Sequence, residues 1–226
     1  TSRQTEKKLL SINEARKNKL ITDWHTTKIV DPQKPGLHVL PEIDLKELAG
    51  YIDWTFFFFA WKLSGKYPAI FNDPLKGVEA KKLFDDAEMY LKEVIDRKLL
   101  TAKAVFGLFS AVSDGDDVKV FSDKNSTESK FVFRFLRNQE TKEKGIPNLS
   151  LSDYIAPETS GLTDTIGAFV VTVTIDDEAY SKYKEDDYAT IMIRILTDRL
   201  AEAAAEWLHE KIRKEYWGYA IQESLP

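Results

Sequence analysis

The chain of 226 residues is 43% hydrophobic, which is enough to bury the core of one large domain or two small ones. Its net charge of -5 comes from 37 acidic and 32 basic side chains that are interspersed. It has no Lys/Arg stripe of the kind that a nucleic-acid backbone requires, so we expect no nucleic-acid partner. There are no cysteines and only three histidines, which excludes disulfides and thiolate metal sites and leaves a zinc site without its usual ligands.

Residues 1–41 are predicted to form a linker that leads into the domain. The polar opening TSRQTEKKLL starts without methionine and lacks the apolar core of a signal peptide. We therefore expect a piece of a longer cytoplasmic polypeptide, or a processed N-terminus. A helix is compatible with the sequence up to about Leu20. Residues 31–41, DPQKPGLHVLP, carry three prolines and a glycine and predict an extended arm.

Residues 42–61 predict a helix that becomes wholly buried. Apolar residues recur near helical spacing at positions 43, 45, 48 and 52, and the aromatic run WTFFFFAW continues the segment. That run is only eight residues long before Lys62 interrupts it. A membrane span needs roughly 18 or more apolar residues, so we expect no membrane partner.

The middle of the chain predicts one helix and four strands. Apolar residues keep a period near 3.6 from Val78 to Leu99, which predicts an amphipathic helix. The segments AVFGLFSAV and VKVFSD flank the turn SDGDD and predict a hairpin, and KFVFRFLRN predicts another strand. The apolar run IGAFVVTVTI, residues 166–175, predicts a strand buried on both faces. The long connection between residues 142 and 164 is of a kind that often carries function.

Residues 185–218 predict the longest helix of the chain. Acidic residues stand at its start, and Lys and Arg precede Gly218 at its end, as the helix dipole and the C-terminal preference for glycine require. About thirty helical residues would span roughly 45 Å.

Four carboxylates of this helix recur every four residues, at Asp198, Glu202, Glu206 and Glu210. Their strip could hold a metal or a cation, and the simpler interpretation is a solvated strip offset by neighbouring Arg and Lys. Other motifs fail. His209 and Glu210 lack the second histidine of a zinc protease, DGDD lacks the spacing of a calcium loop, and no glycine pattern fits a phosphate-binding loop. We predict no catalytic residue and no metal ligand.

Asp53 is the one acidic residue in the segment GYIDWTFFFFAW. A carboxylate among so many aromatic rings must reach solvent, pair with a base or meet a bound cation. The residues alone leave a helix cap, an ion pair and a ligand contact open.

Several long blocks of the chain resemble one family, in sequence and in order. They are YIDWTFFFFAWKLSGKYPAI, GVEAKKLFDDA, LRNQ, LSDYIAP, IGAFVVT and DDYATIMIRILTDRLAEAAAEWLHEKIRKEYWGYA, within a likeness that runs from about Ser11 to the end. They resemble the C-terminal activation domain of cobalamin-dependent methionine synthase. The resemblance implies a single C-shaped α+β domain in which helices, among them a long C-terminal one, flank a bent antiparallel sheet.

In that family the domain binds S-adenosylmethionine and presents it to the cobalamin-binding module of the same polypeptide. There it supports reductive methylation of the inactive cob(II)alamin form, with flavodoxin or another reductase as electron donor. The resemblance therefore implies a non-catalytic part of a methyltransferase, the 5-methyltetrahydrofolate-homocysteine methyltransferase of methionine biosynthesis.

The family's ligand contacts match Asp53, in the YIDW block, and Glu202, in DRLAEAAAEW. A partly desolvated carboxylate would attract the sulfonium and ammonium of S-adenosylmethionine, and nearby aromatic faces would add cation–π attraction. Phe56 stands where the family usually has proline, which should alter local helix geometry more than chemistry.

The resemblance also predicts that part of the site is missing. Family members continue into an Arg-Pro-Ala-Pro-Gly-Tyr-Pro segment that supplies an Arg and backbone contacts to the ligand, and this chain stops at Pro226. We expect residues 42–226 to be an activation domain truncated before that segment. The alternative is an interaction module that docks on a corrinoid protein or a reductase without binding the ligand.

Overall fold

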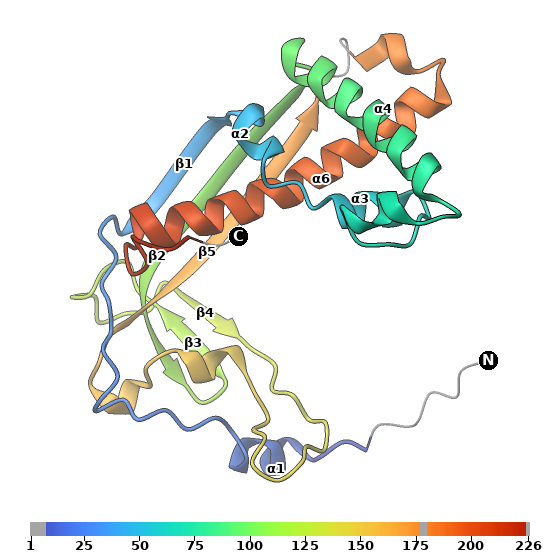
Figure 1. Ribbon diagram of the computed structural model, residues 1–226. Coiled ribbons are helices and arrows are strands. Elements are labelled where there is room, and N and C mark those ends of the chain that lie inside the picture. Colours follow the sequence, from blue (N-terminus) through green and yellow to red (C-terminus); the bar gives the residue numbers. More distant parts are fainter. Residues whose placement is uncertain (1–7, 177–179, 225–226) are drawn as a thin grey trace. The chain divides into compact units, whose positions relative to one another are not determined.

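The computed structural model describes residues 8–176 and 180–224. Helices flank an antiparallel sheet, which confirms the predicted α+β class (Figure 1). Strands β1 (Gly36–Ile43), β2 (Leu100–Asp114), β3 (Asp117–Val120) and β4 (Phe131–Arg134) follow one another in the sheet, and β5 (Asp164–Ile175) pairs with β2.

The described chain forms two compact units. Unit 1 holds residues 8–37, 107–168 and 214–224, and unit 2 holds residues 38–106, 169–176 and 180–213. Each unit therefore draws on segments that are far apart in the sequence. The predicted division between residues 41 and 42 stays a prediction.

The β2–β3 hairpin of unit 1 confirms the predicted turn. Ala111 pairs with Val120 and Asp114 with Asp117, and Gly115 takes a φ of 64° in the turn, a conformation that costs glycine little. Strand β4 adds to β3 in antiparallel register, which confirms the strand expected in KFVFRFLRN. The apolar side chains of this unit gather in one cluster, formed by Phe109, Ala111, Val118, Val120, Phe133, Phe135, Ile155 and Ile166.

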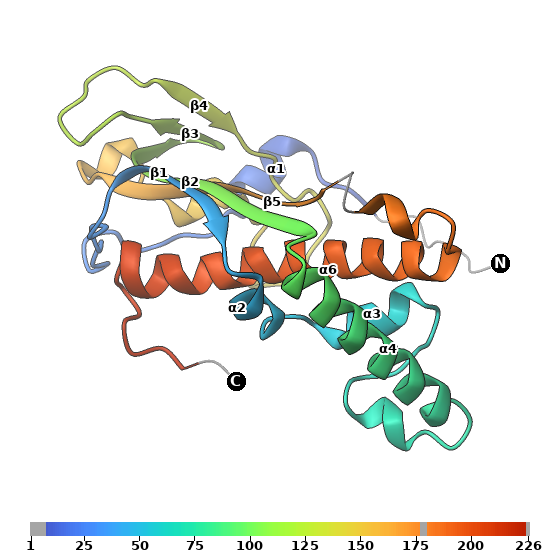
Figure 2. The ribbon, with the colours of Figure 1, turned by 90° about the horizontal axis from the view of Figure 1, so that it is seen from above.

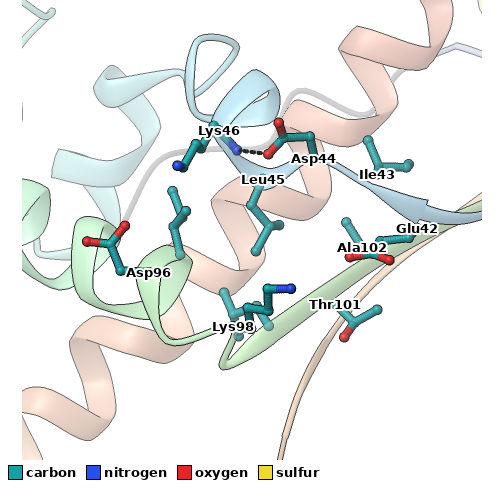
Figure 3. A pocket seen from close by; sticks show the side chains of 11 residues that line it. Glu42, Ile43, Asp44, Leu45, Lys46, Asp96, Lys98, Thr101 and Ala102 are labelled. Atoms are coloured by element: carbon teal, nitrogen blue, oxygen red, sulfur yellow. Dashed lines mark hydrogen bonds between the residues drawn. The ribbon is translucent and has the colours of Figure 1, made fainter.

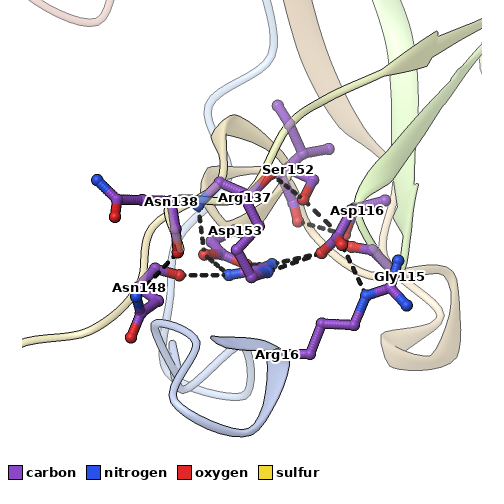
Figure 4. A network of polar contacts seen from close by, with 11 residues as sticks. Arg16, Gly115, Asp116, Arg137, Asn138, Asn148, Ser152 and Asp153 are labelled. Carbon is purple, nitrogen blue, oxygen red and sulfur yellow. Dashed lines mark hydrogen bonds and ion pairs between the residues drawn. The ribbon is translucent and has the colours of Figure 1, made fainter. Parts of the chain in front are cut away.

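Unit 1 also contains a buried polar network (Figure 4). The Arg137 side chain, only 1% exposed, donates from Nε to Asp116 at 2.8 Å. Its two terminal nitrogens donate to the two oxygens of Asp153, each at 2.7 Å. Arg16 of α1 (Ile12–Lys17) also donates to Asp116, at 2.8 Å. The network ties the hairpin turn to the 3-10 turn Leu151–Tyr154 and to the N-terminal helix.

The charges of this network hold one another in their ionised forms. Burial raises the pKa of the Asp116 and Asp153 carboxyls, and the hydrogen bonds from guanidinium groups outweigh it, so both pKa values lie below the ordinary value. The hydrogen bonds that Arg137 donates, led by those to Asp153, raise the pKa of Arg137. Because each buried charge has a partner, the desolvation cost of the cluster is offset.

The N-terminal arm of unit 1 is tied to the C-terminal segment. The Gln33 N–H donates to the Trp217 carbonyl at 3.2 Å, and the Trp217 indole donates to the Val30 carbonyl at 2.7 Å.

The N-terminal helix is shorter than predicted. Only six of its residues are helical in α1, whose N-cap Ser11 forms a capping box with Glu14.

Unit 2 is built around the long helix α6 (Asp187–Lys211), which contacts α2 (Leu45–Ala49), α3 (Trp54–Ala60) and α4 (Gly77–Asp96). These helices lie along one side of α6 in Figure 2.

The remaining elements of the described chain are short. They are 3-10 turns at Ala69–Asn72, Glu158–Ser160 and Ser181–Tyr183 and a π-helical turn at Ile212–Tyr216. The structure confirms the predicted helices at 78–99 and 185–218 to within a few residues, although the latter is α-helical only to Lys211.

A stripe of α6 side chains is buried, at Met192, Leu196, Leu200, Ala203 and Trp207. On the sheet side, His209 meets the ring of Phe169 edge-on, with 4.9 Å between ring centroids. None of the helices in the described ranges is long and apolar enough to cross a membrane.

Two predictions about residues 42–61 are wrong. Residues 42–54 do not form one helix, because β1 extends to Ile43 and the helix that follows is broken between Gly50 and Asp53. The aromatic run is not wholly buried either, since Phe56 is 56% and Phe59 49% exposed. A seven-residue helix turns its side chains all round, and only one side of α3 meets other elements, so a continuous aromatic run cannot be buried throughout.

Strand β5 is not buried on both faces. Phe169 and Val170 are exposed, and from Val171 to Ile175 half-buried and exposed residues alternate. That alternation is typical of an antiparallel strand with one covered face. An apolar run has no polar residues to mark the open face, so its pattern could not reveal it. Residues 36–41, predicted to be part of an extended arm, belong to β1.

Candidate functional site

Asp53 is the N-cap of α3. Its Oδ1 accepts a hydrogen bond from the Thr55 N–H at 2.8 Å, and its backbone has the extended conformation of an N-cap residue. This bond satisfies one of the amide groups that a helix start leaves without a partner. The break at Gly50–Asp53 and the cap together explain why a new helix begins at Trp54.

The aromatic residues after Asp53 anchor this helix start. Phe57 and Phe58 are fully buried, and Trp54 packs edge-on against Phe57 and against Phe84 of α4, with centroid distances of 5.3 and 4.7 Å. Packing therefore fixes the position of the cap, and Asp53 itself stays at the surface. A carboxylate held in place by a buried hydrophobic support can meet a ligand without first being ordered.

The second oxygen of Asp53 has no partner among the residues that the structure describes, and no basic side chain there forms an ion pair with this carboxylate. Of the three possibilities that the sequence left open, the cap is present and the ion pair is not. The cap occupies one oxygen, which leaves the other available to a cation.

The carboxylate strip of α6 divides into two kinds of residue. Asp198, Glu202 and Glu206 are exposed, and within the described ranges none of them has a hydrogen bond or ion pair. Glu210, in contrast, is half-buried and accepts a hydrogen bond from the Tyr51 hydroxyl at 2.7 Å. That bond is the main cause that raises the pKa of Tyr51 to about 12. Glu210 is therefore a packing contact of unit 2, and Glu202 remains open to solvent.

Asp53 and Glu202 both belong to unit 2, on helices that contact each other, α3 and α6. Neither borders the concavity of about 630 Å³ drawn in Figure 3, which lies where β1 and β2 meet α2 and the end of α4. The charged residues of that concavity have both signs, at Glu42, Asp44, Lys46, Asp96 and Lys98. Asp44 is already the N-cap of α2. The charges of this concavity therefore do not favour a ligand of one particular sign.

No group of His, Asp and Glu side chains in residues 8–176 and 180–224 has the arrangement of a metal site. A second concavity of unit 2, which was not predicted, is lined by Trp61, three charged residues of α4 and Tyr188 together with two leucines. The sequence shows that Glu79, Lys82 and Asp86 share one side of α4, because they stand at helical spacing. It does not show that the end of α3 and the start of α6 lie beside them.

Comparison with known proteins identifies the family. Residues 44–226 match the family profile described as vitamin B12 dependent methionine synthase, activation domain. Among solved structures, the chain is similar to the MetH reactivation domain, whose crystal structure was determined with AdoHcy bound. The two share 41% sequence identity and superpose with a TM-score of 0.90, over 96% of this chain and 67% of the other. The resemblance found in the sequence blocks is thereby confirmed.

Proposed function

The chain belongs to the family of activation domains of vitamin B12-dependent methionine synthase, and from this membership we propose that it binds S-adenosylmethionine for reductive methylation of cob(II)alamin. Asp53 and Glu202 are the proposed ligand contacts. The observation that carries the proposal is the similarity, at 41% identity over 96% of this chain, to a reactivation domain solved with AdoHcy bound. AdoHcy is the product that S-adenosylmethionine leaves after it has donated its methyl group.

The geometry at Asp53 supports a role in cation binding. Its exposed carboxylate is held by the cap and has one oxygen without a partner in the described chain. A cation that approaches this oxygen displaces only water and breaks no ion pair. In the partly dehydrated surroundings of a bound ligand, the attraction between a sulfonium and a carboxylate exceeds its value in water.

Glu202 supports the proposal in a different way. It projects from helix α6, and its carboxylate is exposed and has no hydrogen bond or ion pair within the described residues. S-adenosylmethionine carries both a sulfonium and an ammonium, so two separate carboxylates can each neutralise one charge. The two residues together would orient the ligand's methyl-bearing sulfur.

The other parts of the reaction lie outside this chain. Cobalamin, held by another module of the same polypeptide, would supply the methyl acceptor, and flavodoxin or another reductase would supply the electron. The cytoplasmic setting stays a prediction.

Titration calorimetry with S-adenosylmethionine tests the proposal. We expect Asp53→Asn to weaken binding by about 1–3 kcal/mol, because a charge-assisted contact is lost. Asparagine caps helices as well as aspartate does, so this variant removes the charge and keeps the cap. Glu202→Gln should weaken binding in the same direction. The matched control is Asp198→Asn, an exposed carboxylate one turn earlier on α6, which should bind as the wild type does.

The same variants are compared in the full-length polypeptide. There Asp53→Asn should impair reactivation and leave turnover with methyltetrahydrofolate intact. If the wild-type chain and the full-length polypeptide both fail to bind S-adenosylmethionine, the ligand-binding role is wrong and the docking-module alternative replaces it. Equal losses in Asp53→Asn and Asp198→Asn would instead reject the assignment of the site.

A further inference from the structure

A second concavity of unit 2, of about 450 Å³, lies where α3, α4 and α6 meet. We call it the Trp61 pocket. Leu63 and Leu83 contribute its apolar lining, Trp61 and Tyr188 its aromatic lining, and Glu79, Lys82 and Asp86 its charged lining. All of these residues belong to unit 2, and Asp53 and Glu202 are not among them.

Two aromatic rings form adjoining walls of the Trp61 pocket. The rings of Trp61 and Tyr188 are tilted by 50° to one another, with 5.4 Å between their centroids. The Trp61 indole N–H is buried and has no hydrogen-bond partner in the described chain, while the side chain as a whole is half-buried. The atoms of Trp61 that border the pocket are therefore ring carbons. Both walls present π-electrons, which attract cations.

Asp86 is fixed beside these rings. Its Oδ2 accepts a hydrogen bond from the Tyr188 hydroxyl at 2.8 Å, and its other oxygen has no partner among the described residues. Burial, and then this hydrogen bond, raise the pKa of Tyr188, so its phenol stays a donor. Glu79 lies two turns earlier on the same side of α4 and is exposed without a partner in the described ranges.

Lys82 is the one cation in the described lining of the pocket. With Glu79 and Asp86 it leaves a formal charge of one negative unit. Lys82 is exposed and pairs with neither carboxylate in the structure, so it does not neutralise Asp86. The pocket thus combines two aromatic rings, two leucine side chains and an excess of negative charge.

We propose that the Trp61 pocket binds a small organic cation of the alkylated ammonium class. The alkyl groups of such a cation suit the aromatic and leucine walls, and its charge suits Asp86 and Glu79. A metal ion fits less well, because the rings and leucines offer it no ligand atoms. A planar anion would meet two carboxylates. The proposal is independent of the S-adenosylmethionine site, because the two share no residue.

Tetramethylammonium is the probe that tests the proposal, with sodium chloride at equal ionic strength as the blank. In the intact chain, the indole N–H resonance of Trp61 should shift with tetramethylammonium and saturate, and should not shift with sodium chloride. Asp86→Asn and Trp61→Leu should each weaken binding about tenfold, as measured by calorimetry. Lys82→Ala should strengthen binding about threefold, because it removes a like charge.

Two controls separate this site from other effects. Phe59→Leu removes an exposed aromatic ring of α3 that is not part of the lining, and Asp53→Asn alters the proposed S-adenosylmethionine site. Both should bind tetramethylammonium as the wild type does. If Trp61→Leu does not fold, Asp86→Asn and Lys82→Ala still decide, since Asp86 is only half-buried and Lys82 is exposed.

The proposal is overturned if the Trp61 resonance responds equally to both salts, or if folded Asp86→Asn binds tetramethylammonium with wild-type affinity. A peptide that carries trimethyl-lysine identifies the source of the cation. Tighter binding of the peptide than of tetramethylammonium supports a cationic side chain of a protein as the natural occupant. Weaker binding, with the same dependence on Asp86, supports a free small molecule.

Discussion

Two pairs of carboxylates, one pair in each unit, differ in how fully their charges are neutralised. In unit 1, Asp116 and Asp153 are almost fully buried and share the guanidinium group of Arg137. In unit 2, Asp53 and Glu202 are exposed, and no base of the described chain pairs with either. The charges of Asp116 and Asp153 are neutralised within the fold, whereas the charges of Asp53 and Glu202 can be neutralised by a bound cation.

This difference separates structural carboxylates from candidate binding carboxylates. A buried ion pair that loses one member leaves an uncompensated charge in the interior, so its removal should cost stability. An exposed carboxylate returns to water when its ligand leaves, so its removal should cost binding alone. Substitution in the Arg137 network should therefore lower stability, whereas substitution of Asp53 or Glu202 should lower affinity for the ligand.

The largest expected effect is that of Arg137→Met. The variant leaves Asp116 and Asp153 buried without their shared cation, which should lower the free energy of unfolding by about 3–5 kcal/mol. Arg134→Met is the matched control, because Arg134 is 82% exposed and pairs with Asp117 at the surface. That control should change stability by less than about 1 kcal/mol. Urea denaturation measures both, and equal effects would remove the distinction between the two kinds of carboxylate.

Acid should act on unit 1 in the same direction. The folded pKa values of Asp116 and Asp153 lie below their unfolded values, so each group contributes stability that is fully present above the unfolded pKa near 4. That stability is lost as the pH falls through the folded pKa values, when the unfolded state binds protons first. Denaturation at a series of pH values should show stability falling below about pH 4. In Arg137→Met this fall should be smaller, and an unchanged slope would contradict it.

The fold was more predictable from the sequence than the polar network. The period from Val78 to Leu99 and the turn at Gly115 are local signals, and both elements formed where expected. The network joins Arg16, Asp116, Arg137 and Asp153, which lie up to 137 positions apart, and no local pattern brings them together. β1 was missed because three prolines in residues 31–41 favoured a linker, although only Pro41 lies within β1 and a proline is tolerated in an edge strand.

The candidate site was predictable only in part. A cap at Asp53 was one of the alternatives that the residues allowed, because aspartate before a helix is a common N-cap. The role of Asp53 and Glu202 toward a ligand came from the family resemblance, and no spacing rule would have joined residues on two separate helices. The Trp61 pocket was missed for the same reason, since its walls come from α3, α4 and α6.

Substitutions at Asp53 separate the cap from the charge. Asp53→Ala removes both and should lower the free energy of unfolding by about 1 kcal/mol, the usual cost of losing an N-cap. Asp53→Asn retains the cap and should be close to wild type in stability, while it loses affinity for S-adenosylmethionine. Thermal denaturation and calorimetry on the two variants measure the two properties. If Asp53→Asn is as unstable as Asp53→Ala, then its charge belongs to the fold, as in unit 1.

The smallest expected change in stability is that of Glu202→Gln. Its side chain is exposed on α6 and has no partner among the described residues, so the variant should unfold within about 0.5 kcal/mol of the wild type. Tyr51→Phe is the contrasting control, because it removes the hydrogen bond to Glu210 on the same helix and should cost about 1 kcal/mol. Denaturation of both variants checks the order. A measurable loss of stability in Glu202→Gln would mean that this carboxylate supports the fold, and its assignment to ligand binding would lose its physical basis.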